Sequence, residues 1–268
     1  MDHAEIENKV AAHYGASDLT RRILEELGLS DAQPGSVPLE VLFPFDQLHH
    51  GGVRLTQSMA DAAQVHHGAS VLDAGSGIGG ASRWLAHHFG CVVEAIDLSA
   101  EFVKTAAELD VLVGLEDRIS HRVGSVTNLP YESGSFDLVW SQNVTMNVPD
   151  KAAMFAEAYR VLRPGGTYVL THLGESGSAP VDYPLPWAMT AETSFATSPD
   201  AFLQGLTEAG FADVTDHAKN APPPPPPSGP APKDTPAMGS GMDERRNNNT
   251  TAIGDGRIVP MLVTAIRK

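Results

Sequence analysis

The chain has 268 residues, of which 42% are hydrophobic, and it carries a formal net charge of −15. This length fits one large α/β domain, or one domain with a small cap, and the acidic charge argues against a protein that wraps nucleic acid or docks on anionic lipid. Cys91 is the only cysteine, which excludes an intrachain disulfide and a cysteine-based metal cluster.

The first fifty residues predict helices and then a polar segment. Two helical patterns cover residues 4–15 and 18–29, and the second begins behind Asp18, a residue type that is favoured at helix N-caps. A connector with proline and glycine follows, over residues 30–45. The segment "DQLHHGG", residues 46–52, then gathers an acid, an amide, two histidines and two glycines ahead of an amphipathic helix pattern.

Strand-like and helix-like runs alternate from about residue 53 to residue 219. The strand candidates are "SVLDAG", "CVVEAID", "ISHRVGS", "FDLVWSQ" and "TYVLTHL", and the helical runs between them include "GGASRWLAHHF" and "DKAAMFAEAYRVL". This alternation predicts a parallel sheet with helices on both faces. A further helix, "SPDAFLQGLTEAGF", stops at Gly210, and "FADVTDHA" and "IVPMLVTAI" predict two more strands.

A proline-rich insertion, residues 221–241, separates these last two strands. Proline lacks the amide donor and fixes φ, so the insertion is predicted to be a polyproline and flexible loop that interrupts a β-pair at the sheet edge. A tolerated surface insertion is the simpler interpretation of a long loop. The alternative is that a part of it, such as "MDERRNNN", folds over a substrate.

The run "VLDAGSGIGG", residues 71–80, is the most informative motif. A buried strand ends at Asp73, and glycines follow that permit positive φ and close approach of a ligand before a helix begins. The helix N-terminus offers free amides and a partial positive charge, which suit an anionic group. Asp97 ends the next strand, about twenty residues on, where an acid accepts both hydroxyls of a ribose. The pair indicates an adenosine-containing cofactor, either NAD or S-adenosylmethionine (SAM); a plain strand-to-helix turn is the alternative.

Two features favour SAM over NAD. Asp73 precedes the first glycine by two residues, where it would repel a pyrophosphate and attract an ammonium group. The run from residue 128 to residue 171, with "LPYESGSFDLVW" and "RVLRPGGTYVLT", resembles the class I SAM-dependent methyltransferases. Together with "VLDAGSGIGG" and "EAIDLS", this resemblance covers residues 53–173.

Other segments narrow the resemblance. "VAAHYGASDLTRRIL", "PFDQLHHGG", "MNVPDK" and "YPLPWAM" resemble a bacterial subgroup related to the sarcosine and dimethylglycine N-methyltransferases and the ubiquinone and menaquinone C-methyltransferases. The subgroup implies a Rossmann-like, seven-stranded, mostly parallel sheet with helices on both faces. Residues 1–52 are then an N-terminal helical cap and lid, and residues 53–268 are the SAM-binding domain. Two residues depart from the expected pattern, since Asn143 replaces a histidine and His172 replaces an acidic or aromatic residue.

The resemblance implies a set of site residues. The cofactor-binding candidates are Gln47, Asp73, Gly75, Ser76, Gly77, Gly79, Asp97, Leu98, Ser125, Val126 and Gln142. The candidates for the acceptor pocket are Asn143, Met146, Tyr183 and Trp187, with Trp140 as a further aromatic. The catalytic candidates are His49, His172 and Tyr14. A metal is not expected, because adjacent side chains such as those of His49 and His50 usually diverge.

Methyl transfer from SAM to a small-molecule acceptor is the predicted reaction, with S-adenosylhomocysteine (SAH) as product. It needs mainly proximity and orientation. A general base is required only where the acceptor loses a proton early, so an amine needs none, whereas a phenol or activated carbon could use His49 or His172. The alternatives are a SAM-binding protein with a non-methylating reaction, such as a cyclisation, and an NAD-dependent oxidoreductase.

The sequence also supports expectations about partners and location. The N-terminus lacks the basic-then-apolar pattern of a signal peptide, and no apolar run approaches the roughly 20 residues of a membrane helix. We therefore expect a cytoplasmic protein that binds neither nucleic acid nor membrane. A homodimer is left open.

Overall fold

The computed structural model of the chain describes residues 18–49, 51–219 and 241–268. The predicted helix over residues 4–15 and nearly all of the proline-rich insertion lie outside the described residues, as do Tyr14 and His50. None of the described helices is both long and apolar enough to cross a membrane.

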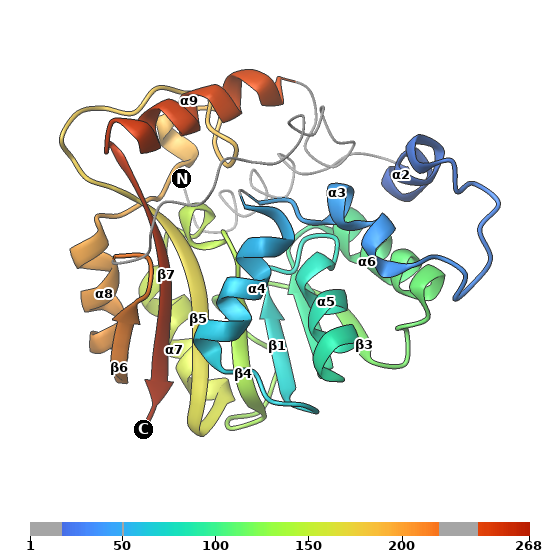
Figure 1. Ribbon diagram of the computed structural model, residues 1–268. Coiled ribbons are helices and arrows are strands. Elements are labelled where there is room, and N and C mark those ends of the chain that lie inside the picture. The colour runs from blue at the N-terminus through green and yellow to red at the C-terminus, as the bar shows by residue number, and fades with distance from the viewer. Residues whose placement is uncertain (1–17, 50, 220–240) are drawn as a thin grey trace.

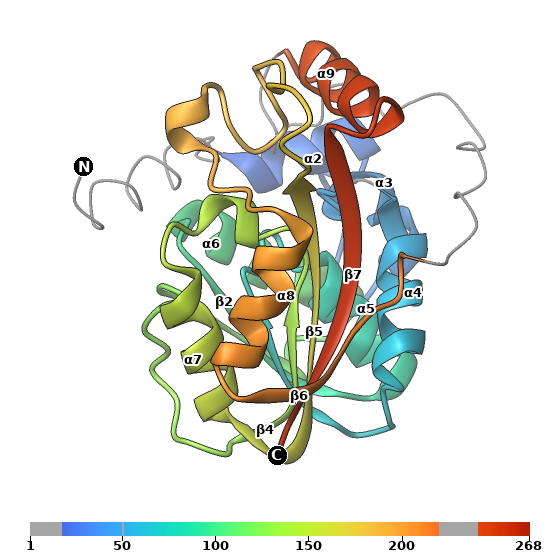
Figure 2. The same cartoon turned by 90° about the vertical axis from the view of Figure 1, so that its left-hand side faces the viewer.

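One seven-stranded sheet forms the centre of the molecule (Figures 1 and 2). Its strands are β1 (Ser70–Ala74), β2 (Val92–Asp97), β3 (Ile119–Val123), β4 (Phe136–Ser141), β5 (Leu162–Glu175), β6 (Phe211–Asp216) and β7 (Ile258–Arg267). Their order is β3-β2-β1-β4-β5-β7-β6, with β7 antiparallel to both of its neighbours and the other pairs parallel. The predicted Rossmann-like sheet and all seven predicted strands are confirmed.

Helices cover both faces of the sheet (Figure 2). One face carries α4 (Gly52–Ala63) and α5 (Gly80–Phe89), and the other carries α6 (Ala100–Val113), α7 (Lys151–Val161) and α8 (Pro199–Glu208). Side chains of successive strand residues point to opposite faces. Trp140 therefore packs with the α4 and α5 layer, while its neighbour Val139 packs with the α7 and α8 layer. Trp140 is fully buried in this core and does not reach the acceptor pocket suggested for it.

The N-terminal segment packs on α6. It comprises α2 (Leu19–Leu27), η1 (Leu39–Val41) and α3 (Phe43–Asp46), and it shares one apolar cluster with Ile78 and Phe102. Asp18 stands at the N-cap position as expected, but it has a φ of 55° and its side chain makes no capping bond. The Leu19 amide instead donates to Glu101 of α6 at 3.1 Å, so a carboxylate distant in sequence satisfies the first turn.

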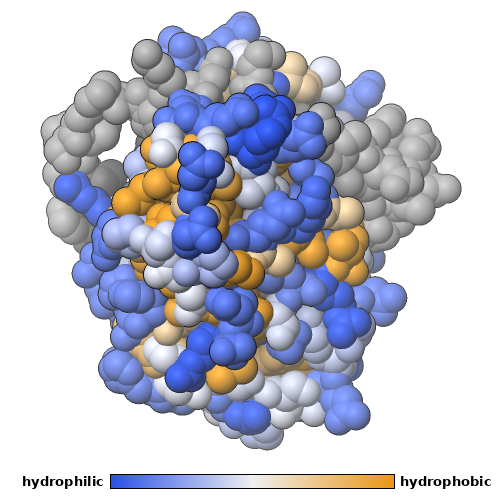
Figure 3. Space-filling model, turned by 90° about the vertical axis from the view of Figure 1, so that its right-hand side faces the viewer, coloured by the Kyte–Doolittle hydropathy of each residue, from blue (hydrophilic) through white to orange (hydrophobic). Residues whose placement is uncertain are grey.

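The connection between β6 and β7 begins and ends at the carboxyl end of the parallel strands. Its described part is α9 (Met242–Gly254), which lies above that end of the sheet in Figure 1. Ala252 of α9 packs with Trp187 and Leu185 of the loop that follows β5. From the side of α2 and α6, the molecular surface is mainly hydrophilic, with hydrophobic side chains gathered in a few patches (Figure 3).

Candidate active site

A cavity of about 140 Å³ lies where β1, β2 and β4 end, and residues of the N-terminal segment close one side of it. Ligands bind at the carboxyl ends of strands in open α/β sheets, at the point where the strand order reverses. Here the order reverses at β1, whose neighbours are β2 and β4. The cavity therefore occupies the position that the fold reserves for a ligand.

The turn after β1 needs its glycines for close packing. Gly75 has a φ of 87°, and a Cβ on it would lie 2.3 Å from Cγ2 of Val144. A Cβ on Gly80 would lie 2.3 Å from the carbonyl oxygen of Asp46. Gly79 was predicted to bind cofactor, but it is not among the residues that line the cavity, and a Cβ on it would lie 2.9 Å from Arg83. Its positive φ serves the start of α5.

The amides of this turn are used by the protein itself. Those of Gly75 and Ser76 both donate to the carbonyl oxygen of Ile96, at 2.8 and 3.0 Å. The Gly79 amide donates to the Ser76 carbonyl, and the Gly77 amide donates to Asp97 at 2.8 Å. These four amides are therefore not free, whereas the expectation of free amides concerned the N-terminus of α5, which begins at Gly80. The turn itself offers few donors to a pyrophosphate.

Asp97 is oriented by the backbone. One of its carboxylate oxygens accepts from the Gly77 amide, and the other accepts from the Ser99 amide at 2.9 Å. Burial raises the pKa of this carboxyl. An ionised carboxylate offers about four lone-pair directions, so each oxygen keeps capacity for a ligand hydroxyl.

Asp73 supplies a second carboxylate to the cavity. It is buried, and it accepts a hydrogen bond of 2.6 Å from the Ser82 hydroxyl. Burial, reinforced by the nearby charge of Asp97, raises the pKa of Asp73 to about 6, while the Ser82 hydrogen bond opposes the shift. Ser76, beside it in the turn, has a buried hydroxyl without a hydrogen-bond partner in the described part of the chain. Both groups line the cavity.

A third carboxylate, that of Asp46, is neutralised within the protein. It lies 3.1 Å from the guanidinium of Arg83, which is itself fully buried and also pairs with Asp110 at 2.8 Å. Arg83 donates further to the carbonyl of Ile78, at 2.6 Å. Among the described residues that line the cavity, none is lysine or arginine. The lining therefore favours a cationic or neutral ligand over an anion.

The predicted lid segment lies against the cavity, with one correction. Leu48 and His49 line it. Gln47 was expected to point toward the cofactor, but its side chain is buried beside the cavity, where its oxygen accepts from Thr56 at 2.8 Å and lies 3.2 Å from His49 Nε2. The amide of Gln142 lies 3.3 Å from His49 Nδ1. Gln47 thus holds the histidine ring rather than the ligand.

His172 is placed away from the cavity, which contradicts the suggestion that it acts as a base. Its ring is fully buried and stacks on Phe202, with ring centroids 4.1 Å apart. Nδ1 lies 2.7 Å from the Thr145 hydroxyl, and Nε2 lies 3.1 Å from the carbonyl oxygen of Thr197. Burial lowers the pKa of His172 to about 4, so it is neutral and joins two loops.

The residues proposed for the acceptor pocket separate into two places. Asn143 lines the cavity. Met146, Tyr183 and Trp187 instead belong to the apolar cluster beneath α9, where the Trp187 indole donates to Ser194 at 3.1 Å. They are not among the residues that line the cavity.

The other side of the cavity is mainly apolar. It contains several of the remaining residues predicted to bind cofactor, together with residues that the sequence did not indicate. Leu98, Val126 and Gln142 line it as expected, but Ser125 does not; its hydroxyl lies 2.8 Å from that of Thr127. The apolar lining that was missed comprises Leu48, Ile78, Phe102, Val144 and Val148. The sequence around these residues does not distinguish them from core residues, because most apolar side chains of a folded protein belong to the core.

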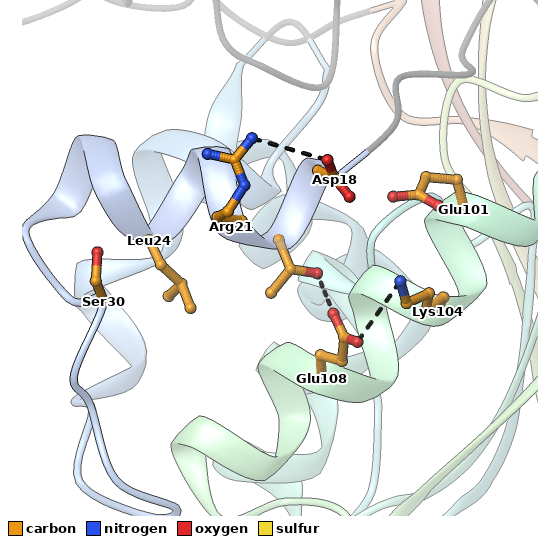
Figure 4. A pocket seen from close by; sticks show the side chains of 8 residues that line it. Asp18, Arg21, Leu24, Ser30, Glu101, Lys104 and Glu108 are labelled. Carbon is orange, nitrogen blue, oxygen red and sulfur yellow. Dashed lines mark hydrogen bonds and ion pairs between the residues drawn. The ribbon is translucent and has the colours of Figure 1, made fainter.

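A second cavity, of about 310 Å³, lies between α2 and α6 (Figure 4). Charged side chains of both helices surround it, with Lys104 and Glu108 4.0 Å apart and Arg21 and Asp18 3.8 Å apart. None of the predicted site residues lines it. Within the described residues, no three His, Cys, Asp or Glu side chains are grouped so that they could hold a metal.

Comparison with known proteins agrees with this geometry. Residues 72–170 match the family described as "Methyltransferase domain". The chain is 33% identical over 154 residues to the sarcosine/dimethylglycine N-methyltransferase of Halorhodospira halochloris, covering 57% of this chain and 55% of the relative. It is 41% identical over 100 residues to the chloroplastic tocopherol O-methyltransferase of Arabidopsis thaliana, covering 37% and 29%. The chain thus spans about half or less of the length of these relatives.

Two solved structures share the whole fold at low identity. A geranyl diphosphate methyltransferase, in complex with geranyl diphosphate and sinefungin, has a TM-score of 0.69 and 22% identity, over 98% of this chain and 100% of that one. The [4+2]-cyclase SpnF has a TM-score of 0.63 and 18% identity, over 97% and 96%. The same fold therefore occurs in a methyltransferase and in a cyclase.

Proposed function

We propose that the protein transfers a methyl group from SAM to a small-molecule acceptor, and the match of residues 72–170 to the family described as "Methyltransferase domain" supports this. The observation that carries the proposal is the charge of the cavity. Asp73 and Asp97 line it, lysine and arginine are absent from its described lining, and the turn amides are already bonded. A sulfonium cofactor with an ammonium group suits such a site, because opposite charges attract strongly where water is excluded.

The residues present fit the cofactor. Asp97 keeps lone pairs for the ribose hydroxyls, and Asp73 offers a carboxylate to the ammonium group. Leu98, Phe102 and Val126 supply apolar surface for a planar base. When bound, SAM would supply an activated methyl group to a lone pair of the acceptor, with cleavage of its carbon–sulfur bond, and SAH would remain.

The protein contributes position and shielding rather than acid–base chemistry. His172 is not among the residues that line the cavity, and burial lowers its pKa to about 4, so it is neutral. Both ring nitrogens of His49 lie within 3.3 Å of glutamine side chains. An acceptor that needs no base, such as an amine in its free-base form, fits this arrangement best. The lid residues Leu48 and His49 would exclude water from the reacting atoms, and residues 1–52 are proposed as the cap to which they belong. The net charge of −15 supports a small molecule rather than a nucleic acid as partner.

Calorimetric titration of the purified protein with SAM and SAH tests the proposal, with Asp97→Ala as the variant that should lose binding. Glu108→Ala, on the far side of α6, is the control and should bind normally. Formation of SAH with an amine panel then tests turnover. A folded protein that binds neither SAM nor SAH would refute the proposal.

A non-methylating reaction is the second candidate, favoured by the fold shared with the [4+2]-cyclase. It predicts tight SAM or SAH binding without any cofactor consumption. Following SAH by mass spectrometry during product formation separates the two candidates.

A further inference from the structure

Asn143 has an unusual backbone conformation at the cavity. It follows β4 with a φ of 56°, in the left-handed region that costs free energy for most residues other than glycine. Its neighbour Val144 is the residue that fills the space above Gly75. Strain of this kind persists only where surrounding contacts determine it, and it is concentrated at functional sites.

A reciprocal pair of hydrogen bonds with Thr171 of β5 holds this conformation. The Asn143 amide N–H donates to Thr171 Oγ1 at 2.8 Å, and Thr171 Oγ1 donates to Asn143 Oδ1 at 2.7 Å. Thr171 is buried. A hydroxyl has only one proton to donate, and here that proton goes to Oδ1. This fixes the orientation of the Asn143 amide group.

The orientation leaves the two donors of Nδ2 directed away from Thr171. Asn143 lines the cavity, and its recorded hydrogen bonds within the described residues involve only Thr171. We propose that Asn143 determines acceptor specificity by donating from Nδ2 to an oxygen that the acceptor carries beside the atom to be methylated. Thr171 is the positioning residue that aims this donor.

The cavity's charge defines the chemical class of that acceptor. Asp73 and Asp97 line the same space, and its described lining holds no lysine or arginine to offset a further carboxylate or phosphate beside the carboxylate that SAM itself carries. The oxygen is therefore that of a neutral hydroxyl, ether or carbonyl group, as in an amino alcohol. This inference rests on the proposed methyl transfer and adds the feature by which the acceptor is chosen.

Paired acceptors that differ in one oxygen provide the test. SAH formation is measured for dimethylaminoethanol against dimethylpropylamine, and for methoxyphenol against ethylphenol. The wild type should favour the oxygen-bearing member of a pair in kcat/KM by about tenfold, the effect of one hydrogen bond. Asn143→Asp keeps the acceptor for Thr171 and tolerates positive φ but loses the donors, so it should abolish the preference in the methoxyphenol pair, whose ether oxygen can only accept.

Thr171 variants separate aiming from folding. Thr171→Ser keeps the hydroxyl and should keep the preference, whereas Thr171→Val should reduce it, and both should bind SAH like the wild type by calorimetry. Turnover without an oxygen preference, or a preference in the methoxyphenol pair that survives Asn143→Asp, would overturn this inference alone. Absence of turnover with every pair would also overturn this inference, whereas a folded wild type that binds neither SAM nor SAH would overturn the proposed function as well.

Discussion

Replacing Arg83 by methionine should destabilise the whole domain. The guanidinium is completely buried and makes five contacts within 3.3 Å, to Asp46, Asp110 and the carbonyls of Ala106 and Ile78. Methionine has a similar length but no donors, so the variant leaves two buried carboxylates with no guanidinium partner. Removing one partner of a buried ion pair costs about 3–5 kcal/mol, a large part of the roughly 5–15 kcal/mol that stabilises a typical protein.

Urea unfolding followed by circular dichroism measures this loss. Arg21→Met is the matched control, because Arg21 forms an exposed pair with Glu25 and its loss should barely move the unfolding midpoint. Adding Asp46→Asn to Arg83→Met removes one of the orphaned charges and should recover part of the stability, as expected for coupled neighbours. Equal midpoints for Arg83→Met and Arg21→Met would refute the reasoning.

Three further predictions concern the cavity and the core. SAM affinity should rise as pH increases through about 6 and level off above it, because the pKa of Asp73 is raised to about 6 and only its ionised form attracts a cation. In calorimetry, Asp73→Asn should bind SAM weakly, and its affinity should not change with pH in this range. Gly75→Ala should lower the free energy of unfolding by about 1–3 kcal/mol because of the positive φ, and it should also weaken SAH binding, since the new Cβ meets Val144. Adding Val144→Ala should relieve this clash but not the backbone strain. Full recovery of stability in the double variant would contradict the φ argument. His172→Gln should lower the melting temperature yet leave the pH profile of kcat unchanged, and loss of the acidic limb of that profile, where a base becomes protonated, would restore His172 as a base.

The sheet and the cofactor end of the site could be predicted because their signals are local. Each strand carries its own apolar run, and a glycine turn between Asp73 and Asp97 is readable from spacing alone. The narrow resemblance to methyltransferases added the number of strands and the mostly parallel arrangement of the sheet. In each of these features, residues that are close in the sequence are also close together in the folded structure.

The errors arose where a distant partner decides the outcome. The Asp18 side chain makes no capping bond, and the first helical amide, that of Leu19, instead donates to Glu101 of α6. The side-chain oxygen of Gln47 accepts from Thr56 and does not face the cavity. His172 looked catalytic from its place at a strand end, but its ring packs on Phe202 across the core. Such pairings depend on tertiary contacts that no local pattern encodes.

The internal bonding of the glycine turn has a consequence for the rate of turnover. Because the amides of Gly75, Ser76 and Gly77 bond to Ile96 and Asp97 in the protein alone, departure of a product exposes no new unsatisfied donor. The turn should therefore remain folded between catalytic cycles, so that product exchange requires no refolding of the turn. Hydrogen exchange at these three amides should be equally slow with and without SAH.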